Sequence, residues 1–427
     1  MRTFLIVWFG QLVSHIGSGL SSFALGVWVY EETQSVTDFA LISLCIYLPH
    51  IITSPVAGAI VDRWNRRYAM ILSDAASGIG TVAIWILLYF DKLEIWHIYI
   101  AVAINSFFNS FQWPAYSSAT TTLVPKKDLG KANGLLQSAR AAAKIIAPTM
   151  AGFLVKEIQI EGVMFIDFMT FLCALGTLLC VRFPKPEVTD KTPPKLEELF
   201  QDTVYAWKYI TIRPGLFWLL IFLAVTYFNL GVLQVVFWPM MLSFADSKAL
   251  GMVLSIGGCG WLLGSVMMSA WGGPKRRVYG IYLPVIMQGI CLLFGGVRTS
   301  VPLVAIGVFG YLFAYPIAIS CNRAIWQTKI PLELQGRVFA LDFTIEKAVS
   351  VLAYVISGPL VDTFLDPILA PGGLLATTIV GDILGVGKGR GIGLLFVSLG
   401  IITIMGTFFA YRYPRVRRVE KELPDAI

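Results

Sequence analysis

The strongest constraint on this chain is a series of long apolar segments separated by short polar loops. A helix needs about 20 predominantly apolar residues to cross the hydrocarbon core of a bilayer. That core offers no water to backbone groups, so a spanning segment must satisfy its own hydrogen bonds as a helix. The sequence therefore predicts an all-α membrane protein with twelve transmembrane helices, at residues 4–29, 39–61, 68–90, 95–123, 134–156, 162–182, 215–242, 249–271, 277–298, 300–327, 337–364 and 391–413.

Composition excludes an ordinary soluble protein, because 56% of the 427 residues are hydrophobic and only 14% are charged. The net charge of +7 is explained by the lysine and arginine that mark cytoplasmic loops, and it does not indicate a nucleic-acid partner. All six cysteines fall in apolar segments and lack the spacing of a metal site or a disulfide framework. We expect no metal and no cofactor.

A basic turn between the second and third segments sets the predicted orientation. Residues 58–67 carry three arginines and one aspartate between two membrane-length segments. Under the positive-inside rule this turn is cytoplasmic. Twelve spans then place both termini in the cytoplasm, the side on which most of the 33 lysine and arginine residues fall. We expect a multi-pass protein of the plasma membrane, which is the inner membrane of a cell that has two.

The two halves of the chain resemble each other, because Gly58 matches Gly264 and Gly152 matches Gly358 at a constant separation of 206 residues. Internal duplication of this kind predicts two six-helix bundles related by a pseudo-twofold axis. The predicted organisation is an N-terminal bundle at 1–182, a central cytoplasmic loop with an amphipathic helix at 183–213, and a C-terminal bundle at 214–427 with an extended outer loop and a basic tail. The outer loop, about 366–390, is glycine-rich, and we interpret it as a flexible external cap.

The basic turn resembles the loop signature of the major facilitator superfamily, Gly-x-x-x-Asp-(Arg/Lys)-x-Gly-(Arg/Lys)-(Arg/Lys). Asn65 replaces the internal glycine of that signature, and asparagine is the next best residue for a left-handed turn. The alternative is that the arginines are topology signals only. The resemblance implies a conformational latch made of Gly58, Asp62, Arg63, Arg66 and Arg67.

Other stretches resemble a narrower group within that superfamily, the drug and siderophore exporters typified by macrolide efflux proteins and the enterobactin exporter. The resemblance implies twelve helices in two bundles that alternate between inward-open and outward-open states. The stretches that carry it are Gln11-x-x-Ser14-x-x-Gly17, Leu48-Pro49, Ala132-Asn133-Gly134 and Gln335-Gly336-Arg337-Val338.

Ionisable side chains within the predicted spans are functional candidates, because a charge inside the membrane is costly. A buried carboxylate that takes up a proton on one side and releases it on the other suits antiport, and Asp74 and Asp167 both remain candidates. Arg140 and Glu346 occupy equivalent positions in the two halves and form either switching or static ion pairs. The embedded candidates are Asp74, Arg140, Lys144, Asp167, Glu346 and Lys347.

In the family that the sequence resembles, the first, fourth, seventh and tenth helices line a central cavity. Aromatic rings mixed with neutral hydrogen-bonding groups suit a bulky amphipathic solute, although ordinary aromatic packing is the alternative for many of them. Arg323 would favour a substrate with anionic or carbonyl oxygens. The lining candidates are Gln11, His15, Asn105, Asn109, Trp113, Tyr227, Asn229, Gln234, Tyr311, Tyr315, Asn322 and Arg323.

The expected function is secondary active export of an amphipathic small molecule (a drug, siderophore or secondary metabolite) by alternating access, with protons as the coupling ion. The alternative is a lipid or lysophospholipid flippase of the same fold without proton coupling. The sequence has no Walker motif, histidine-rich metal site or nucleophile elbow, so we do not expect an enzyme. The expected partners are the small-molecule substrate, protons and the lipid bilayer, and the expected state is a monomer.

Overall fold

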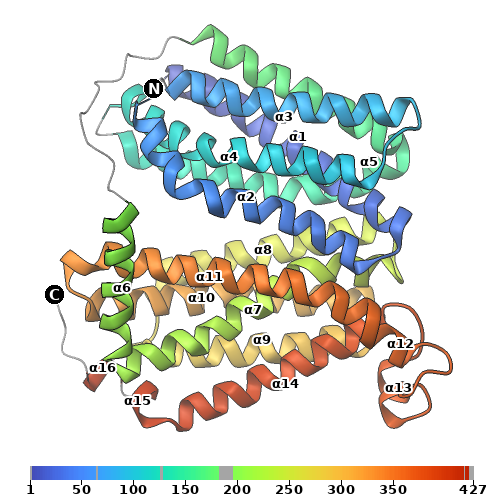
Figure 1. Cartoon of the computed structure of the whole chain (residues 1–427), viewed down its shortest axis with the longest axis vertical. Coiled ribbons are helices and arrows are strands. Elements are labelled where there is room, and N and C mark those ends of the chain that lie inside the picture. The colour runs from blue at the N-terminus through green and yellow to red at the C-terminus, as the bar shows by residue number, and fades with distance from the viewer. Residues whose placement is uncertain (1, 64–65, 126–127, 182–195, 418, 423–427) are drawn as a thin grey trace. The chain divides into compact units, whose positions relative to one another are not determined.

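The computed structural model describes residues 2–63, 66–125, 128–181, 196–417 and 419–422, and for short stretches of some helices it describes the backbone only. Every regular element in these ranges is a helix (Figure 1). The long helices are α1 (Arg2–Thr33), α2 (Val36–Arg63), α3 (Arg66–Tyr89), α4 (Ile95–Leu123), α5 (Leu129–Cys180), α6 (Leu196–Thr211), α7 (Pro214–Leu242), α8 (Ser247–Trp271), α9 (Tyr279–Val297), α10 (Val301–Lys329), α11 (Leu332–Leu360) and α14 (Arg390–Arg412).

The structure confirms the predicted fold class. Within the described residues, ten helices are long and apolar enough to cross a membrane. One of them, α5, covers two predicted spans, because its backbone leaves helical geometry at Gln159, where φ is 57°. Counting α5 twice and including α4 gives the twelve spans expected from the sequence.

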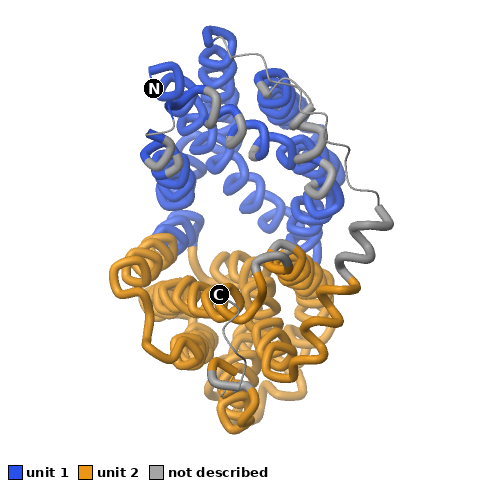
Figure 2. Tube along the Cα trace, turned by 90° about the vertical axis from the view of Figure 1, so that its left-hand side faces the viewer, with its two compact units in different colours: residues 1–193, 246–255 blue, residues 194–245, 256–427 orange. Residues whose placement is uncertain are grey.

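The chain forms two compact units, which Figure 2 shows in different colours. Unit 1 comprises Met1–Pro193 and Asp246–Ser255, so it takes in α1 to α5 and the beginning of α8. Side chains from α1, α3, α4 and α5 meet in its apolar core, among them Phe4, Met70 and Leu178. Local signals set its helix boundaries: the Ser35 hydroxyl accepts the backbone N–H of Asp38 at 3.1 Å and caps α2.

Unit 2 comprises Pro194–Ala245 and Ile256–Ile427. Its core brings together α6, α7, α9, α10 and α11, and Trp326 is among its largest fully buried side chains. The amphipathic helix expected in the central segment is α6, which buries Ala206 and Ile210 in this core. Residues 183–195 of the predicted central loop lie outside the described residues.

The glycine-rich segment that the sequence suggests is a flexible cap has defined local structure. It contains α12 (Asp366–Leu369) and α13 (Ile379–Leu384), and it follows a single π-helical turn, η2 (Val361–Leu365). The Asp366 carboxylate accepts the backbone N–H of Gly391 at 2.9 Å, and the Arg390 guanidinium donates to the carbonyl of Leu384 at 2.6 Å. These bonds tie the start of the segment and the end of α13 to the first residues of α14.

Within unit 1, the backbones of α5 and of the first turns of α8 lie so close together that no side chain fits between them at two glycines. A Cβ atom added at Gly251 would lie 2.2 Å from the carbonyl oxygen of Pro148, and one added at Gly152 would lie 2.6 Å from the carbonyl oxygen of Ser247. Small residues allow such close approach between membrane helices. The Thr149 hydroxyl adds a hydrogen bond to the Ser255 hydroxyl at 2.5 Å.

We expect Gly251→Ala to destabilise unit 1 by about 1–3 kcal/mol, because the new methyl group meets backbone rather than a movable side chain. Unfolding of the purified chain in detergent, followed by circular dichroism, measures the loss. The matched control is Gly176→Ala in α5, where an added Cβ meets no described atom within 4 Å. Equal stability of the two variants would contradict the close packing of α5 on α8.

Candidate functional site

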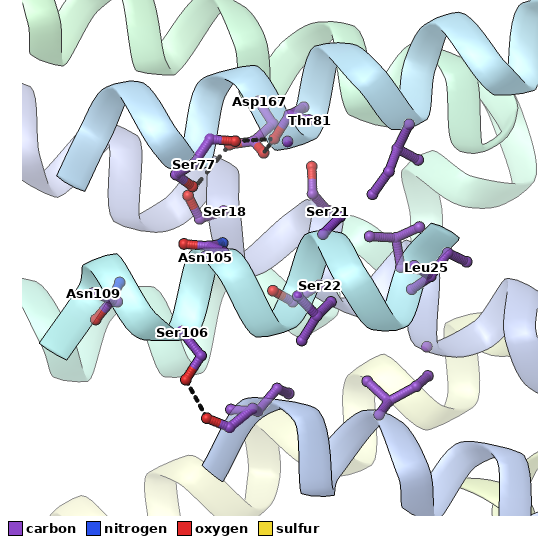
Figure 3. A pocket seen from close by; sticks show the side chains of 18 of the residues that line it. Ser18, Ser21, Ser22, Leu25, Ser77, Thr81, Asn105, Ser106, Asn109 and Asp167 are labelled. Carbon is purple, nitrogen blue, oxygen red and sulfur yellow. Dashed lines mark hydrogen bonds between the residues drawn. The ribbon is translucent and has the colours of Figure 1, made fainter. Parts of the chain in front are cut away.

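A cavity of about 400 Å³ lies inside unit 1, between α1, α2, α3, α4 and α5, and its wall combines apolar with polar side chains. Figure 3 shows hydroxyl and amide side chains from several of these helices at its wall. The structure places two predicted lining residues here, Asn105 and Asn109, one helical turn apart on α4. The polar side chains of the wall are those of Ser18, Ser21, Ser22, Tyr47, His50, Ser77, Thr81, Asn105, Ser106, Asn109 and Asp167.

Asp167 of α5 is the carboxylate of this cavity wall, and only 3% of the residue is exposed. It accepts a hydrogen bond from the Thr81 hydroxyl of α3 at 3.0 Å and a longer one from the Ser18 hydroxyl of α1 at 3.4 Å (Figure 3). Gly17 allows this arrangement, because a Cβ atom there would lie 3.0 Å from the Asp167 carboxylate and 1.9 Å from the Thr170 hydroxyl. The two hydroxyl donors partly replace the water that the carboxylate loses on burial.

A second carboxylate, Asp74 of α3, is held in a buried amide network. The Gln11 amide of α1 donates to one carboxylate oxygen at 2.7 Å, and the Gln112 amide of α4 donates to the other. Gln112 also donates to the Gln11 side-chain oxygen at 3.1 Å. The three residues are 1%, 4% and 9% exposed in the order Gln11, Asp74 and Gln112, so three helices are joined through groups that have little access to solvent.

The cavity and this network are linked through Asn109. Its side-chain amide donates to the Gln112 oxygen at 3.3 Å, while Asn109 itself lies in the cavity wall. A hydrogen-bonded path therefore runs from the cavity through Asn109 and Gln112 to Asp74. A change at the cavity wall can thus alter the environment of the second carboxylate.

The remaining predicted residues of unit 1 that the structure describes do not line this cavity. Arg140 and Lys144 lie on α5 with exposed side chains, and His15 on α1 is partly buried. In the basic turn, the Arg67 guanidinium donates to the carbonyls of Leu178 and Leu179 at 2.9 and 2.8 Å, which ties the start of α3 to the end of α5. The side chains of Asp62, Arg63, Arg66 and Trp113, and the surroundings of Gly58, lie outside what the structure describes.

In unit 2, several predicted lining residues are buried and contact other side chains of the helix bundle. The Asn229 amide donates to the Thr403 hydroxyl at 2.6 Å, and Asn322 accepts from the Trp326 indole at 2.6 Å. The ring of Tyr315 lies 5.1 Å from that of Trp261. Tyr227 and Tyr311 are 2% and 1% exposed.

The other candidates of unit 2 are more accessible. Gln234 has an exposed side chain that accepts from the Tyr354 hydroxyl at 2.9 Å. Arg323 is exposed near the end of α10. Glu346 and Lys347 form an ion pair at 2.8 Å with both side chains 23% exposed. Because they are neighbours in sequence, this pair joins no second helix.

Sequence reasoning did not select Gln112, Thr81 or Ser22 as site residues, although the structure places Gln112 and Thr81 beside a buried carboxylate and Ser22 in the cavity wall. A signal was present in α1, where Ser14, Ser18 and Ser22 recur every fourth residue and so share one helix face. Small hydroxyl residues are common in transmembrane helices as packing residues, so this pattern alone does not separate a cavity wall from an interface.

A family model described as "Major Facilitator Superfamily" matches residues 7–354 of this chain. Macrolide efflux protein A of Streptococcus pyogenes is 25% identical over 365 residues, which is 84% of this chain and 89% of that protein. The multidrug efflux pump Tap of Mycolicibacterium fortuitum is 24% identical over 373 residues, with the same two coverages.

Solved transporter structures share the fold at low sequence identity. One is a bacterial homologue of the human lysosomal transporter Spinster in an inward-facing, unoccupied conformation. It superposes with a TM-score of 0.72 at 13% identity and covers 99% of this chain and 98% of its own. A bacterial homologue of the iron transporter ferroportin gives a TM-score of 0.70 at 12% identity, with 96% of this chain and 98% of that chain covered. At this identity the likeness concerns the fold alone.

Proposed function

The chain belongs to the major facilitator superfamily, and on that premise we propose that it exports an amphipathic small molecule in exchange for protons by alternating access. It is a multi-pass membrane transporter of small molecules, which is not a class of enzyme. Its relatives named for macrolide and multidrug efflux support export as the direction of transport. We further propose that it works as a monomer in the plasma membrane.

The observation that carries this proposal is the placement of Asp167. Its carboxylate lies in the wall of a cavity large enough for part of a drug-sized solute, and two hydroxyl groups hold it. A carboxylate in this position can exist with or without its proton, and the two forms differ by a full charge at the place where a solute would bind. Substrate and proton then compete for the same cavity, which is the requirement for antiport.

The chemistry of the cavity wall also bears on the substrate class. Its described residues offer one carboxylate and the imidazole of His50 together with hydroxyl and amide groups, and they include no lysine or arginine. Such a wall suits a neutral or cationic solute that carries several hydrogen-bonding groups on an apolar body, as a macrolide does. The exposed Arg323, which the sequence suggested would attract anionic oxygens, belongs to unit 2.

We propose that the basic turn works as the conformational latch and that both termini are cytoplasmic. The hydrogen bonds from Arg67 to two carbonyls at the end of α5 give this turn a defined attachment within unit 1. Hydrogen bonds from a charged guanidinium are strong enough to stabilise one conformational state. They are also weak enough to be replaced by other hydrogen bonds when the conformation changes. The switching role of Arg140 and Glu346 remains part of the same proposal.

The test is transport by the purified full chain in proteoliposomes loaded with acidic buffer. We expect accumulation of a radiolabelled macrolide several-fold above the level in protein-free liposomes. Protons that leave the acidic lumen through the transporter would drive the solute into the lumen in exchange. Protein-free vesicles are essential, since a basic drug also accumulates passively in an acidic lumen. Protein-dependent uptake that survives collapse of the pH gradient by nigericin would contradict proton coupling and would favour the uncoupled flippase.

A further inference from the structure

An apolar groove with a volume of about 660 Å³ lies in unit 2, between α8, α9, α10 and α14. Its walls include Met267, Leu283, Met287, Phe313 and Phe408. Leu283 is 72% exposed and Phe408 is 54% exposed, so the groove opens outward within unit 2. In a membrane-spanning helix bundle, such a surface is covered by lipid rather than by water.

The length of the groove corresponds to one leaflet of the bilayer. Along α9 its lining runs from Tyr279 to Met287, which at 1.5 Å per residue is about 12 Å. The hydrocarbon core of a bilayer is about 30 Å thick, so one leaflet contributes about 15 Å. A single acyl chain that enters from the end at Tyr279 would therefore reach along the groove without crossing the midplane.

Basic side chains gather at that end of the groove. The guanidinium of Arg412 lies 5.2 Å above the ring of Phe408, and that of Arg417 lies 5.7 Å above the ring of Tyr411. Both rings line the groove. Lys275 and Arg276, which are also exposed, follow Trp271 of its wall in the loop between α8 and α9.

The C-terminal segment is fixed against this loop, so its positive charges are held in place. The Glu420 carboxylate accepts the backbone N–H groups of Arg277 and Val278 at 3.0 and 3.1 Å. The Lys329 ammonium donates to the Glu420 carbonyl at 2.6 Å. The short helices α15 (Pro414–Arg417) and α16 (Val419–Glu422) are thereby anchored beside the loop that begins at the end of the groove.

We propose that this groove is a specific site for one anionic phospholipid of the leaflet on the side of the loop 272–278. An acyl chain occupies the apolar walls, and the phosphate-bearing headgroup contacts Arg412 and Arg417, with Lys275 and Arg276 beside it. Basic pockets between transmembrane helices recognise anionic headgroups in this way. A zwitterionic lipid has no net charge to match the cluster, so the site selects for headgroup charge.

The test is a titration of the purified full chain in detergent with acyl-labelled fluorescent phosphatidylglycerol and, separately, with the matching phosphatidylcholine, followed by fluorescence anisotropy. We expect tighter binding of phosphatidylglycerol. The double substitution R412Q/R417Q should lower that affinity about 25-fold, because each basic residue near the headgroup contributes roughly fivefold. Leu283→Trp fills the groove without changing any charge and should also lower binding, by at least roughly fivefold.

The matched controls are Arg298→Gln, an exposed charge at the opposite end of α9, and Ile306→Trp, an equally exposed apolar residue of α10 outside the groove lining. Both should bind as the unmodified chain does. If the arginine variant weakens binding while Leu283→Trp does not, the attraction is diffuse surface charge and the groove has no part in it. If neither variant weakens binding, the site does not exist.

Discussion

Asp167→Asn is expected to abolish accumulation driven by a pH gradient while leaving substrate exchange intact. Asparagine has nearly the same size and keeps one oxygen that can accept from Ser18 or Thr81, but it cannot take up a proton. With one proton exchanged per neutral substrate, a gradient of one pH unit is worth about 1.4 kcal/mol, which supports about tenfold accumulation. Without coupling, accumulation falls to the level of protein-free liposomes.

Two measurements on the same proteoliposomes separate loss of coupling from loss of binding. Net uptake under an imposed gradient should fall to the protein-free level. Exchange of labelled for unlabelled substrate without a gradient should continue within about threefold of the unmodified rate, because the remaining cavity wall is unchanged. Asp382→Asn, which makes the same chemical change at an exposed residue of α13, is the matched control.

Asp74→Asn distinguishes between the two buried carboxylates. If this variant loses gradient-driven uptake while Asp167→Asn retains it, the coupling group is Asp74 and our assignment is wrong. The hydrogen-bonded path through Asn109 and Gln112 would then be the route by which the cavity reaches that group. If Asp167→Asn stops exchange as well as net uptake, Asp167 holds the substrate or the helices rather than the coupling proton.

The helices were predictable from the sequence because membrane thickness fixes their length and polar loops mark their ends. The predicted span 95–123 has the same bounds as α4, where Glu94 and His97 form a capping box. The local structure of 366–390 was not predictable, because it depends on single contacts such as that between Asp366 and Gly391. Glycine content indicates freedom of the backbone, but it does not show which contacts restrict it.

The candidate site was predictable only in part, for a similar reason. Helical spacing places Asn105 and Asn109 on one face of α4, and both lie in the cavity wall. Gln11 of α1 was also expected to line the cavity, but its side-chain amide donates a hydrogen bond to Asp74 instead. Which face of α1 meets α3 is decided by packing between residues more than sixty positions apart in the sequence, as the separation of 63 for this pair shows. A periodicity argument within one helix contains no information of that kind.

Asp74→Leu is expected to destabilise unit 1 by about 2–4 kcal/mol, because it removes both acceptor oxygens from a network with little access to water. The amides of Gln11 and Gln112 would keep their donors without these partners, and each unsatisfied buried group costs about 1–3 kcal/mol. The summed cost of two unsatisfied amides would cover a wider range. Hydrogen bonds between membrane helices contribute about 0.6 kcal/mol on average and at most about 1.7 kcal/mol, so we expect a loss of stability in the lower part of that summed range. Titration of the purified chain with a denaturing detergent measures the loss.

A double-mutant cycle with Gln112→Leu shows whether the cost comes from the network itself. When both partners are replaced by apolar side chains, few donors are left unsatisfied, so the second substitution should cost less in the Asp74→Leu background than in the unmodified chain. We expect a coupling of about 1 kcal/mol. Asp74→Asn keeps one acceptor oxygen and should therefore lose less stability than Asp74→Leu. Additive costs in the cycle would mean that the hydrogen bond between Gln112 and Asp74 does not contribute to stability. The proposed path from the cavity to Asp74 would then lack its last step.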